Sequence, residues 1–335
     1  MKVALDAMGG DYAPQEIIKG ALEAINLYPQ LEKVYLVGDE KQINDHLSHK
    51  HEKIEIIHAG EVITMEDHPG TAYRRKKDAS ITVATRLVKN KEAHAVVSAG
   101  STGAQMVAAL FGLGRIKGVD RPAIGTVLPT LGGGKLLLDA GANADCKVQN
   151  LLQFAKMGSI YAEKVLGIEN PKVALVNIGN EKTKGNELVI KTYEELANLE
   201  NINFVGNIEG RDIPRGTVDV MVCDGFVGNV VLKLIEGMAS TFSQLLKDEI
   251  NKGVISKMGG ALMLPALQGL KKRMDYSEYG GAPLLGIDGI SVICHGSSKA
   301  KAIHNAIKVA YESYSQGFIE NLRLNMEVGE VKDEQ

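Results

Sequence analysis

The segment KVALDAMGGD, residues 2–11, joins a short apolar run to a turn rich in Gly and Asp. Four further apolar runs end in the same way, in a turn of Gly, Asp, Asn or Ser. They are residues 95–97 before SAGSTG, 136–138 before DAGAN, 173–176 before NIGN, and 218–222 before CDG. Parallel strands of an open α/β sheet end over a shared cleft, where helix N-termini suit an anion. The pattern therefore predicts an α/β fold with a polar site at the carboxyl ends of its strands.

Helical and β-branched segments alternate along the chain. Helical spacing occurs at residues 15–27, 80–88, 148–165 and 187–199, and β-branched runs occur at 34–37 and 54–57. This alternation predicts β-α units on a mainly parallel sheet flanked by helices. Residues 119–129 and 135–138 flank TLGGG, which predicts a hairpin or a longer turn. No linker divides residues 1–335, so we expect one α/β unit, with two lobes possible.

Composition bounds the class of protein. The 335 residues are 44% hydrophobic, enough for a large core without disulfides or metals. Cys146, Cys223 and Cys294 are odd in number and lie outside any CxxC spacing, which favours buried free thiols in a reducing cytoplasm. A net charge of −3 argues against a bulk nucleic-acid binder. No run reaches the ~20 apolar residues of a membrane span, so membrane contact would be peripheral.

Familiar nucleotide-binding and hydrolase motifs are incomplete or absent in this sequence. GLGRIK at residues 112–117 lacks the third Gly of the dinucleotide fingerprint, and Gly134-Lys135 is followed by Leu instead of Ser or Thr. His68, His295 and Ser297 stand without a nucleophile elbow, so we interpret these histidines as structural. The carboxylates near Asp139 have no metal-ligand spacing, and no metal is expected. The sequence predicts neither a nucleotide enzyme nor a hydrolase.

An anion at these turns needs positive charge as well. One helix dipole favours an anion by only ~0.3–1 kcal/mol, so a phosphate dianion requires several amides and a cation. Lys182 and Lys184 lie in the polar loop 177–186, and Lys233 lies two turns into the helix after Asp224. The run RRKK at residues 74–77 is interpreted as a solvated or docking face.

A second informative region follows a long helix expected at residues 226–252. Residues 254–274 are apolar, broken by glycine, and then basic, and Pro265 predicts a break with a new helix near it. This composition fits an interfacial amphipathic segment, an ordinary core or dimer helix, or a docking surface for an acidic protein that carries an acyl chain. An apolar strand at 287–294 and a final helix at about 298–324 are expected afterwards. The candidate contact residues are Val254, Ile255, Met258, Leu262, Leu264, Leu267, Leu270, Lys271, Lys272 and Arg273.

Several of these motifs together resemble the bacterial phosphate acyltransferase family. They are DAMGGD with Ala13-Pro14, residues 98–104, Gly141-Ala142-Asn143, KGNE at 184–187, DGFVGN at 224–229 and YGGA at 279–282. The resemblance covers nearly the whole chain. Ser101 stands where the family often has Asn, and Asn180 stands where the family commonly has Thr or Glu. The resemblance therefore defines the roles of these two side chains less clearly.

The resemblance implies a homodimer with an isocitrate/isopropylmalate dehydrogenase-like fold and no cofactor. It implies transfer of an acyl group from acyl-[acyl carrier protein] to inorganic phosphate, the entry step to phospholipid synthesis. It also implies a cytoplasmic enzyme that associates with the inner face of the cell membrane and supplies a membrane glycerol 3-phosphate acyltransferase. Two alternatives stay open: a phosphate acetyl- or butyryltransferase that uses coenzyme A thioesters, and a non-catalytic membrane adaptor for the carrier protein.

The chemistry assigns roles to the turn residues. Phosphate is itself the nucleophile, so no Ser or Cys triad is needed. The enzyme must position phosphate and stabilise an oxyanion. The predicted catalytic residues are Asp6, Lys184, Asp224, Asn229 and Lys233. The predicted phosphate or substrate contacts are Gly9, Gly10, Asp11, Ser98, Gly100, Ser101, Thr102, Gly103, Asp139, Asn143, Asn177, Gly179 and Gly225.

Overall fold

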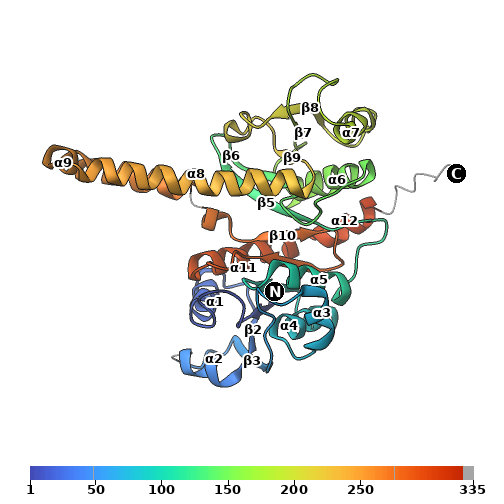
Figure 1. Ribbon diagram of the computed structural model, residues 1–335. Helices are drawn as coiled ribbons and strands as arrows, with labels where there is room; N and C mark the ends of the chain where they lie inside the picture. The colour runs from blue at the N-terminus through green and yellow to red at the C-terminus, as the bar shows by residue number, and fades with distance from the viewer. Residues whose placement is uncertain (48, 275, 327–335) are drawn as a thin grey trace.

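A single sheet of eleven strands runs through the computed structural model, which describes residues 1–47, 49–274 and 276–326 (Figure 1). Residues 271–274 and 276 are described in their backbone only. The order across the sheet is β3 (Ile54–His58), β2 (Lys33–Gly38), β1 (Lys2–Asp6), β4 (Ala95–Ser98), β11 (Ile290–Ile293), β10 (Ala282–Leu285), β5 (Ala123–Thr130), β6 (Gly133–Leu138), β9 (Val220–Val222), β7 (Val173–Asn177) and β8 (Phe204–Glu209). The predicted fold class, α/β with a mainly parallel sheet, is confirmed.

The sheet changes direction at its centre. β10 is antiparallel to both neighbours, and β5 and β6 form the antiparallel hairpin expected around TLGGG. The strands β6, β9, β7 and β8 therefore run opposite to β1, β2, β3 and β4. The expectation that the five turns follow parallel strands over a shared cleft is wrong in part, because the turns after β6, β7 and β9 lie at the sheet edge opposite to those after β1 and β4. Sheet twist brings the two sets closer, because ~20–25° per strand accumulates to roughly 90° over the four steps from β4 to β6.

Alternating side chains bury both faces of the sheet. Leu136 and Leu138 pack with one core cluster, and Leu137, between them, packs with another. The first face is covered by α1 (Gln15–Leu27), α6 (Val148–Lys164), α7 (Glu187–Ala197), α11 (Ala300–Ser315) and α12 (Phe318–Met326). The second face is covered by α3 (Pro69–Arg75), α4 (Ser80–Lys89), α5 (Thr102–Gly112) and the start of α8 (Gly225–Asn251). A short α2 (Glu40–His46) lies beside β3.

The long helix α8 extends beyond the body of the molecule (Figure 1). It has 27 residues, and only Gly225 and Gly228 in its first turn are buried. At ~1.5 Å per residue such a helix is about 40 Å long. α9 (Val254–Leu262) lies at its outer end, and α10 (Leu264–Met274) returns to contact β5. The helix predicted at 226–252 and the break predicted at Pro265 are both present.

The carboxyl-terminal helix differs from its prediction. One helix was expected at about 298–324, but the chain forms α11 and α12. Gly317, at φ +59°, separates them. A left-handed residue ends an α-helix, and Gly adopts this conformation without the steric cost of a Cβ atom. The division of the chain into domains stays a prediction.

Candidate active site

The turns after β1 and β4 are held together by a buried carboxylate. Asp6 is 3% exposed, and Ser98 Oγ donates a hydrogen bond to its Oδ2 at 2.7 Å. That bond ties the turn after β4 to the turn after β1, and Gly100 N–H donates to Ser98 Oγ at 3.0 Å within the turn after β4. A Cβ at Gly9 would lie 2.6 Å from Asp6 Oδ2 and 2.7 Å from Gly100 N, so the two turns pack without room for a side chain. Burial raises the pKa of Asp6 above its usual value.

A second carboxylate builds the turn after β6. Asp139 Oδ1 accepts hydrogen bonds from the N–H groups of Ile124, Gly141 and Ala142, and Oδ2 accepts from the backbone and side-chain amides of Asn143. Burial raises the pKa of Asp139, and these N–H donors oppose the shift. The side chain therefore fixes residues 139–143 as one rigid turn.

The start of α8 is fastened to this turn. Gly225 N–H donates to Asn143 O at 2.7 Å, and Asp224 caps the helix by accepting from Val227 N–H at 2.8 Å. A Cβ at Gly228 would overlap the carbonyl oxygen of Asp139. The close approach places the next turn of α8, with Asn229 and Lys233, over the turn after β6.

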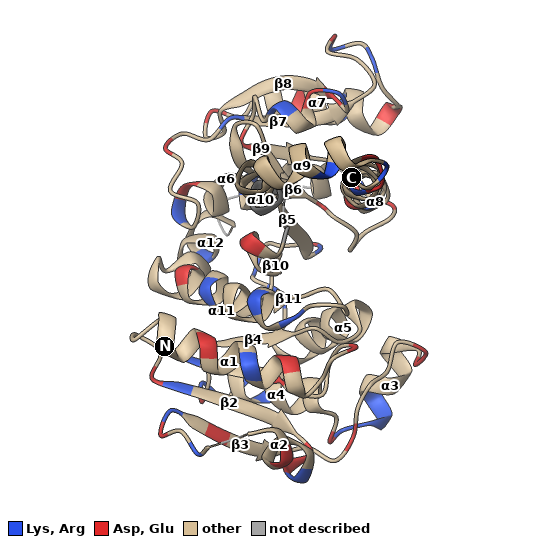
Figure 2. Cartoon of the chain, turned by 90° about the vertical axis from the view of Figure 1, so that its left-hand side faces the viewer, with Lys and Arg blue, Asp and Glu red and all other residues tan. Residues whose placement is uncertain are grey.

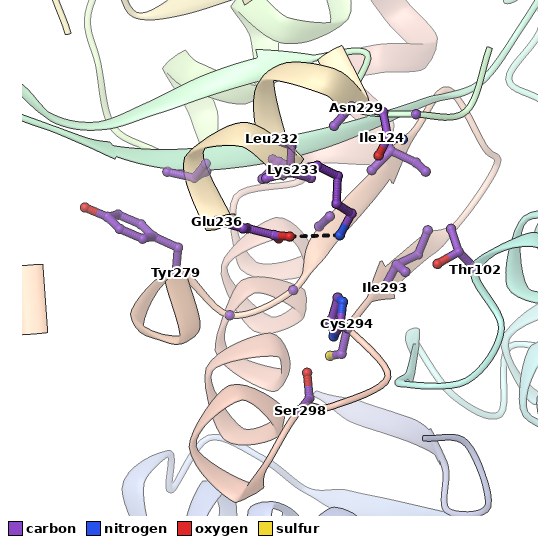
Figure 3. A pocket seen from close by; sticks show the side chains of 18 residues that line it. Thr102, Ile124, Asn229, Leu232, Lys233, Glu236, Tyr279, Ile293, Cys294 and Ser298 are labelled. Carbon is purple, nitrogen blue, oxygen red and sulfur yellow. Dashed lines mark hydrogen bonds and ion pairs between the residues drawn. The ribbon is translucent and has the colours of Figure 1, made fainter. Parts of the chain in front are cut away.

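These elements enclose a cavity of about 310 Å³, which we call the central cavity (Figure 3). Its walls come from both halves of the sheet, the start of α5, the second and third turns of α8, and the chain on either side of β10 and β11. The lining residues are Thr102, Ile124, Thr126, Val127, Ala140, Gly141, Asn229, Leu232, Lys233, Glu236, Tyr279, Gly280, Gly281, Ala282, Ile293, Cys294, His295 and Ser298. Turns that follow oppositely directed strands, β4 and β6, thus meet at one cavity.

The charged groups of the central cavity lie on α8. Lys233 Nζ donates to Glu236 Oε2 at 2.8 Å, one turn further along the helix (Figure 3). The Lys233 side chain is 52% exposed, so its ammonium keeps access to a ligand. Asn229 lies beside Gly141, whose added Cβ would be 3.5 Å from the Asn229 side chain. The result is a cation and an amide group on one face of a helix.

His295 adds a proton donor to the central cavity. Ser297 N–H donates to His295 Nδ1 at 3.2 Å. Ser297 Oγ also lies 2.8 Å from Nδ1, and in the tautomer whose Nδ1 accepts from the backbone N–H the imidazole carries its proton on Nε2. Asp11 N–H donates to Gly296 O at 2.8 Å and thereby anchors this segment to the turn after β1.

The cysteine in the central cavity is buried, which disfavours its reactive thiolate form. Burial raises the pKa of Cys294 to about 12, so its thiol stays protonated near neutral pH. Burial also raises the pKa of Cys146 to about 11 and that of Cys223 well above its usual value. All three cysteines are free, as the sequence predicts.

A second cavity, about 550 Å³, continues from the first between β5, α8 and α10, and we call it the apolar cavity. The two cavities share four lining residues, Thr126, Val127, Leu232 and Glu236. Its other lining residues are Leu128, Pro129, Ile235, Ala239, Ser240, Phe242, Ser243, Leu246, Lys247, Ile250, Leu267 and Leu270. The polar central cavity thus opens into the apolar cavity.

Comparison with known proteins identifies the chain. A family model described as "Fatty acid synthesis protein" matches residues 1–321. The chain belongs to this family. A "Phosphate acyltransferase" of Heliobacterium modesticaldum is 60% identical over 324 residues, which cover 95% of this chain and 96% of that protein. The enzyme class predicted from the sequence, a phosphate acyltransferase, is confirmed.

Solved structures support the fold of this family member. A phosphotransacetylase from Streptococcus pyogenes superposes with a TM-score of 0.62 at 14% identity, covering 94% of both chains. A 4-hydroxythreonine-4-phosphate dehydrogenase from Klebsiella pneumoniae gives a TM-score of 0.52 at 13% identity, covering 93% of this chain and 98% of the other. The expected dehydrogenase-like architecture is therefore confirmed.

The predicted site residues separate into those that line the central cavity and those that build its walls. Thr102, Asn229 and Lys233 line the cavity. The buried or hydrogen-bonded residues of the strand-end turns hold the walls in place. They are Asp6, Gly9, Gly10, Asp11, Ser98, Gly100, Ser101, Gly103, Asp139, Asn143, Asp224 and Gly225.

The loop after β7 lies apart from both cavities. Lys184 is exposed, and its carbonyl oxygen accepts from Asn177 Nδ2 at 2.9 Å. A Cβ at Gly179 would lie 2.8 Å from Glu181 Oε2 and 3.0 Å from Lys184 Cγ, so the loop folds on itself. Lys184, Asn177 and Gly179 line neither of the two cavities. The basic residues of α3, coloured blue in Figure 2, also line neither cavity.

Sequence reasoning gave no role to several residues of the central cavity. Glu236, Ser298 and Cys294 were not proposed as ligand contacts, and His295 was interpreted as structural. The motif YGGA at residues 279–282 was recognised as part of the family pattern, but it carried no proposed contact. The available signal was the Gly-Gly pair of this motif, which the structure places between η2 (Tyr276–Tyr279) and β10 at the cavity wall.

We call helices α8, α9 and α10, residues 225–274, the arm, and its α9 and α10 contain two kinds of apolar residue. Val254, Ile255 and Leu262 on α9 are 75%, 87% and 84% exposed. Met258 and Leu264 are also exposed, whereas Leu267 and Leu270 line the apolar cavity. The side chains of Lys271, Lys272 and Arg273 lie outside the described residues. In the part of the chain that the structure describes, no helix has the length and apolar character to cross a membrane.

Within the same described part, no group of three or more His, Cys, Asp or Glu side chains is arranged to hold a metal ion. The expectation that the protein needs neither metal nor cofactor stays a prediction.

Proposed function

We propose that this phosphate acyltransferase transfers a fatty acyl group from acyl-[acyl carrier protein] to inorganic phosphate in the central cavity. A phosphate oxygen attacks the thioester carbonyl carbon, a C–O bond forms and the C–S bond breaks. The proton of hydrogen phosphate ends on the thiol of the carrier protein, so the reaction balances with these two substrates alone. The observation that carries the proposal is the polar central cavity, which has a lysine and continues into an apolar chamber.

In this proposal phosphate binds between α8 and the start of α5. Lys233 supplies the positive charge, and Asn229 and Thr102 supply hydrogen bonds. Charge-assisted hydrogen bonds are roughly twice as strong as neutral ones, and the N-terminus of α5 adds a favourable dipole. We assign the cation to Lys233 in preference to Lys184, because Lys233 lines the central cavity and Lys184 lines neither cavity.

The turn carboxylates act as positioning residues. Asp139 orders the turn that carries Gly141, and Asp224 caps the helix that carries Lys233. Asp6 joins the turns after β1 and β4, which lead into α5. Their role is to hold donors in place before substrate binds, which avoids reorganisation in the transition state.

His295 is the proposed partner of the leaving group. Its Nε2–H is the donor that remains after Nδ1 has accepted from Ser297 N–H. Donation to the departing sulfur stabilises the charge that develops when the C–S bond breaks. Neutral Cys294 beside it forms no competing acyl-enzyme.

The experiment measures release of free thiol from palmitoyl-[acyl carrier protein], with and without inorganic phosphate. Palmitoyl- and acetyl-coenzyme A serve as rival donors, and acyl phosphate is trapped as its hydroxamate. We expect release from the carrier protein only when phosphate is present. Release from coenzyme A thioesters alone would support a phosphate acetyl- or butyryltransferase instead. If no donor releases thiol, the non-catalytic adaptor becomes the better explanation.

The outer end of the arm is the proposed membrane contact. Acyl phosphate is a reactive, amphipathic product, and delivery at a membrane surface would feed a glycerol 3-phosphate acyltransferase there. The exposed residues of α9 provide an apolar surface beyond the body of the protein (Figure 1).

The outward face of α8, where Val230, Leu234 and Met238 are exposed, is the surface on which we place the homodimer contact. A mass in analytical sedimentation equal to that of one chain would contradict this placement.

Replacing Ile255 by Glu is expected to weaken binding to vesicles of mixed zwitterionic and anionic phospholipid. Full burial of an Ile side chain stabilises by ~1.5–3 kcal/mol, so co-sedimentation should fall by roughly tenfold or more. Leu324→Glu is the matched control, because Leu324 on α12 is 70% exposed and lies away from the arm. Equal binding by the wild type and Ile255→Glu would contradict a membrane role for α9.

A further inference from the structure

The apolar cavity is an extension of the central cavity along α8. Thr126, Val127 and Leu232 form walls of both, and Glu236 stands at the junction. At the far end the lining is formed by Ile250 of α8 and by Leu267 and Leu270 of α10. Glu236 and Lys247 are the charged residues among those that line it. The apolar cavity therefore offers apolar surface to one part of a ligand, while the reactive end of that ligand lies near Lys233.

We propose that the apolar cavity binds the acyl chain of the thioester substrate, and that Ala239 and Ser243 determine the chain length that the enzyme accepts. This inference rests on the proposed function. An acyl chain is the part of that substrate that is wholly apolar, and it is attached directly to the reacting carbonyl carbon. Each methylene group transferred from water to such a surface contributes roughly fourfold in affinity. A short acyl group would leave most of the chamber unfilled.

Ala239 and Ser243 are spaced so that both face the chamber. They are four residues apart on α8, which puts them on one side of the helix. Ser243 Oγ donates to Ala239 O at 2.7 Å, so its hydroxyl is satisfied within the helix and presents no free polar group to the cavity. Both side chains are small, as is Ser240 beside Ala239, whereas Ile235, Phe242 and Leu246 in the same wall are large. Small residues at these two positions keep the chamber open.

The helix provides a length scale for this cavity. α8 rises about 1.5 Å per residue, so Ala239 lies about 4.5 Å beyond Glu236 and Ser243 about 10 Å beyond it. An extended chain advances about 1.2 Å per bond, as the three bonds of an extended peptide residue show. Ser243 is therefore reached after roughly nine bonds and Ala239 after roughly four. A bulky side chain at position 239 should therefore exclude shorter acyl chains than a bulky side chain at position 243 does.

The test measures kcat/KM for octanoyl- and palmitoyl-[acyl carrier protein] at saturating phosphate. Ser243→Phe should lower the value for the palmitoyl donor at least a hundredfold and the value for the octanoyl donor less than tenfold. Ala239→Phe should lower both. Gln244→Phe is the matched control, since Gln244 is exposed on the same turn and does not line the cavity; both of its values should stay within threefold of wild type.

The outcomes separate the inference from the proposed function. No phosphate-dependent release by the wild type would overturn the proposed function. If the wild type is active and Ser243→Phe reduces both donors equally, or neither, chain-length selection at Ser243 is wrong. If Ser243→Phe instead halves the mass in solution, the chamber is closed by a second copy of the chain. Circular dichroism of each variant shows whether a loss comes from unfolding.

Discussion

Lys233→Met is expected to lower kcat/KM for phosphate-dependent thiol release by about 10²–10³, the usual cost of removing a charged or oxyanion-stabilising donor. Lys233 lines the central cavity, and its ammonium donates a hydrogen bond to Glu236 at 2.8 Å. Met keeps a similar length and apolar stem, so the change removes mainly the positive charge. Part of the loss should appear as a higher KM for phosphate, because ground-state binding also uses the cation.

Lys184→Met is the natural comparison for this prediction. The sequence offered both lysines, but Lys184 is exposed on a loop that lies outside the two cavities. We expect less than a tenfold reduction in its kcat/KM. A loss of 10² or more in Lys184→Met, with Lys233→Met within tenfold of wild type, would show that the wrong lysine has been assigned and that the loop after β7 reaches the substrate.

Gly228→Ala is expected to lower the free energy of unfolding by about 3 kcal/mol or more, as overpacking of a rigid contact does. The added methyl group would overlap the carbonyl oxygen of Asp139, which is backbone and is fixed by the hydrogen bonds of its own turn. This overlap can be relieved only if α8 moves away from β6. Lys233 and Asn229 would move with it, so activity should fall together with stability. Urea unfolding followed by circular dichroism measures the change.

Gly237→Ala controls for the helix itself. Gly237 lies nine residues further along α8, is exposed, and would place its new Cβ in open space. Replacing Gly by Ala within a helix normally stabilises it by about 0.5–1 kcal/mol. The two variants should therefore shift stability in opposite directions. Destabilisation of similar size in both would mean that the contact between Gly228 and Asp139 is not the cause.

Local patterns predicted local structure well. The helix at residues 15–27 has the expected bounds, because its periodic apolar residues bury one face against the sheet. The hairpin around TLGGG and the break near Pro265 followed from backbone restrictions of Gly and Pro. The final helix was wrong in part, because Gly317 was not recognised as the point where α11 ends.

The candidate site was only partly predictable. The strand-end turns were correctly located in the sequence, and Thr102, Asn229 and Lys233 do line the central cavity. Glu236 was missed because one carboxylate on a long helix looks like any solvated residue. Leu267 and Leu270 were grouped with the residues of α9, since an apolar stripe does not specify whether lipid or a neighbouring element covers it.

By itself the sequence determined the family, the enzyme class and the type of the strongly periodic elements, because these depend on residue identity and on periods of two and 3.6 residues that are local. Only the tertiary structure decided which turns meet and which lysine reaches the cavity. An apolar run has the same period in either direction, so strand direction is fixed by pairing between residues far apart in the chain. The reversal at β10 and the hairpin of β5 and β6 set that pairing, and sheet twist then brings Thr102 and Gly141 to one cavity.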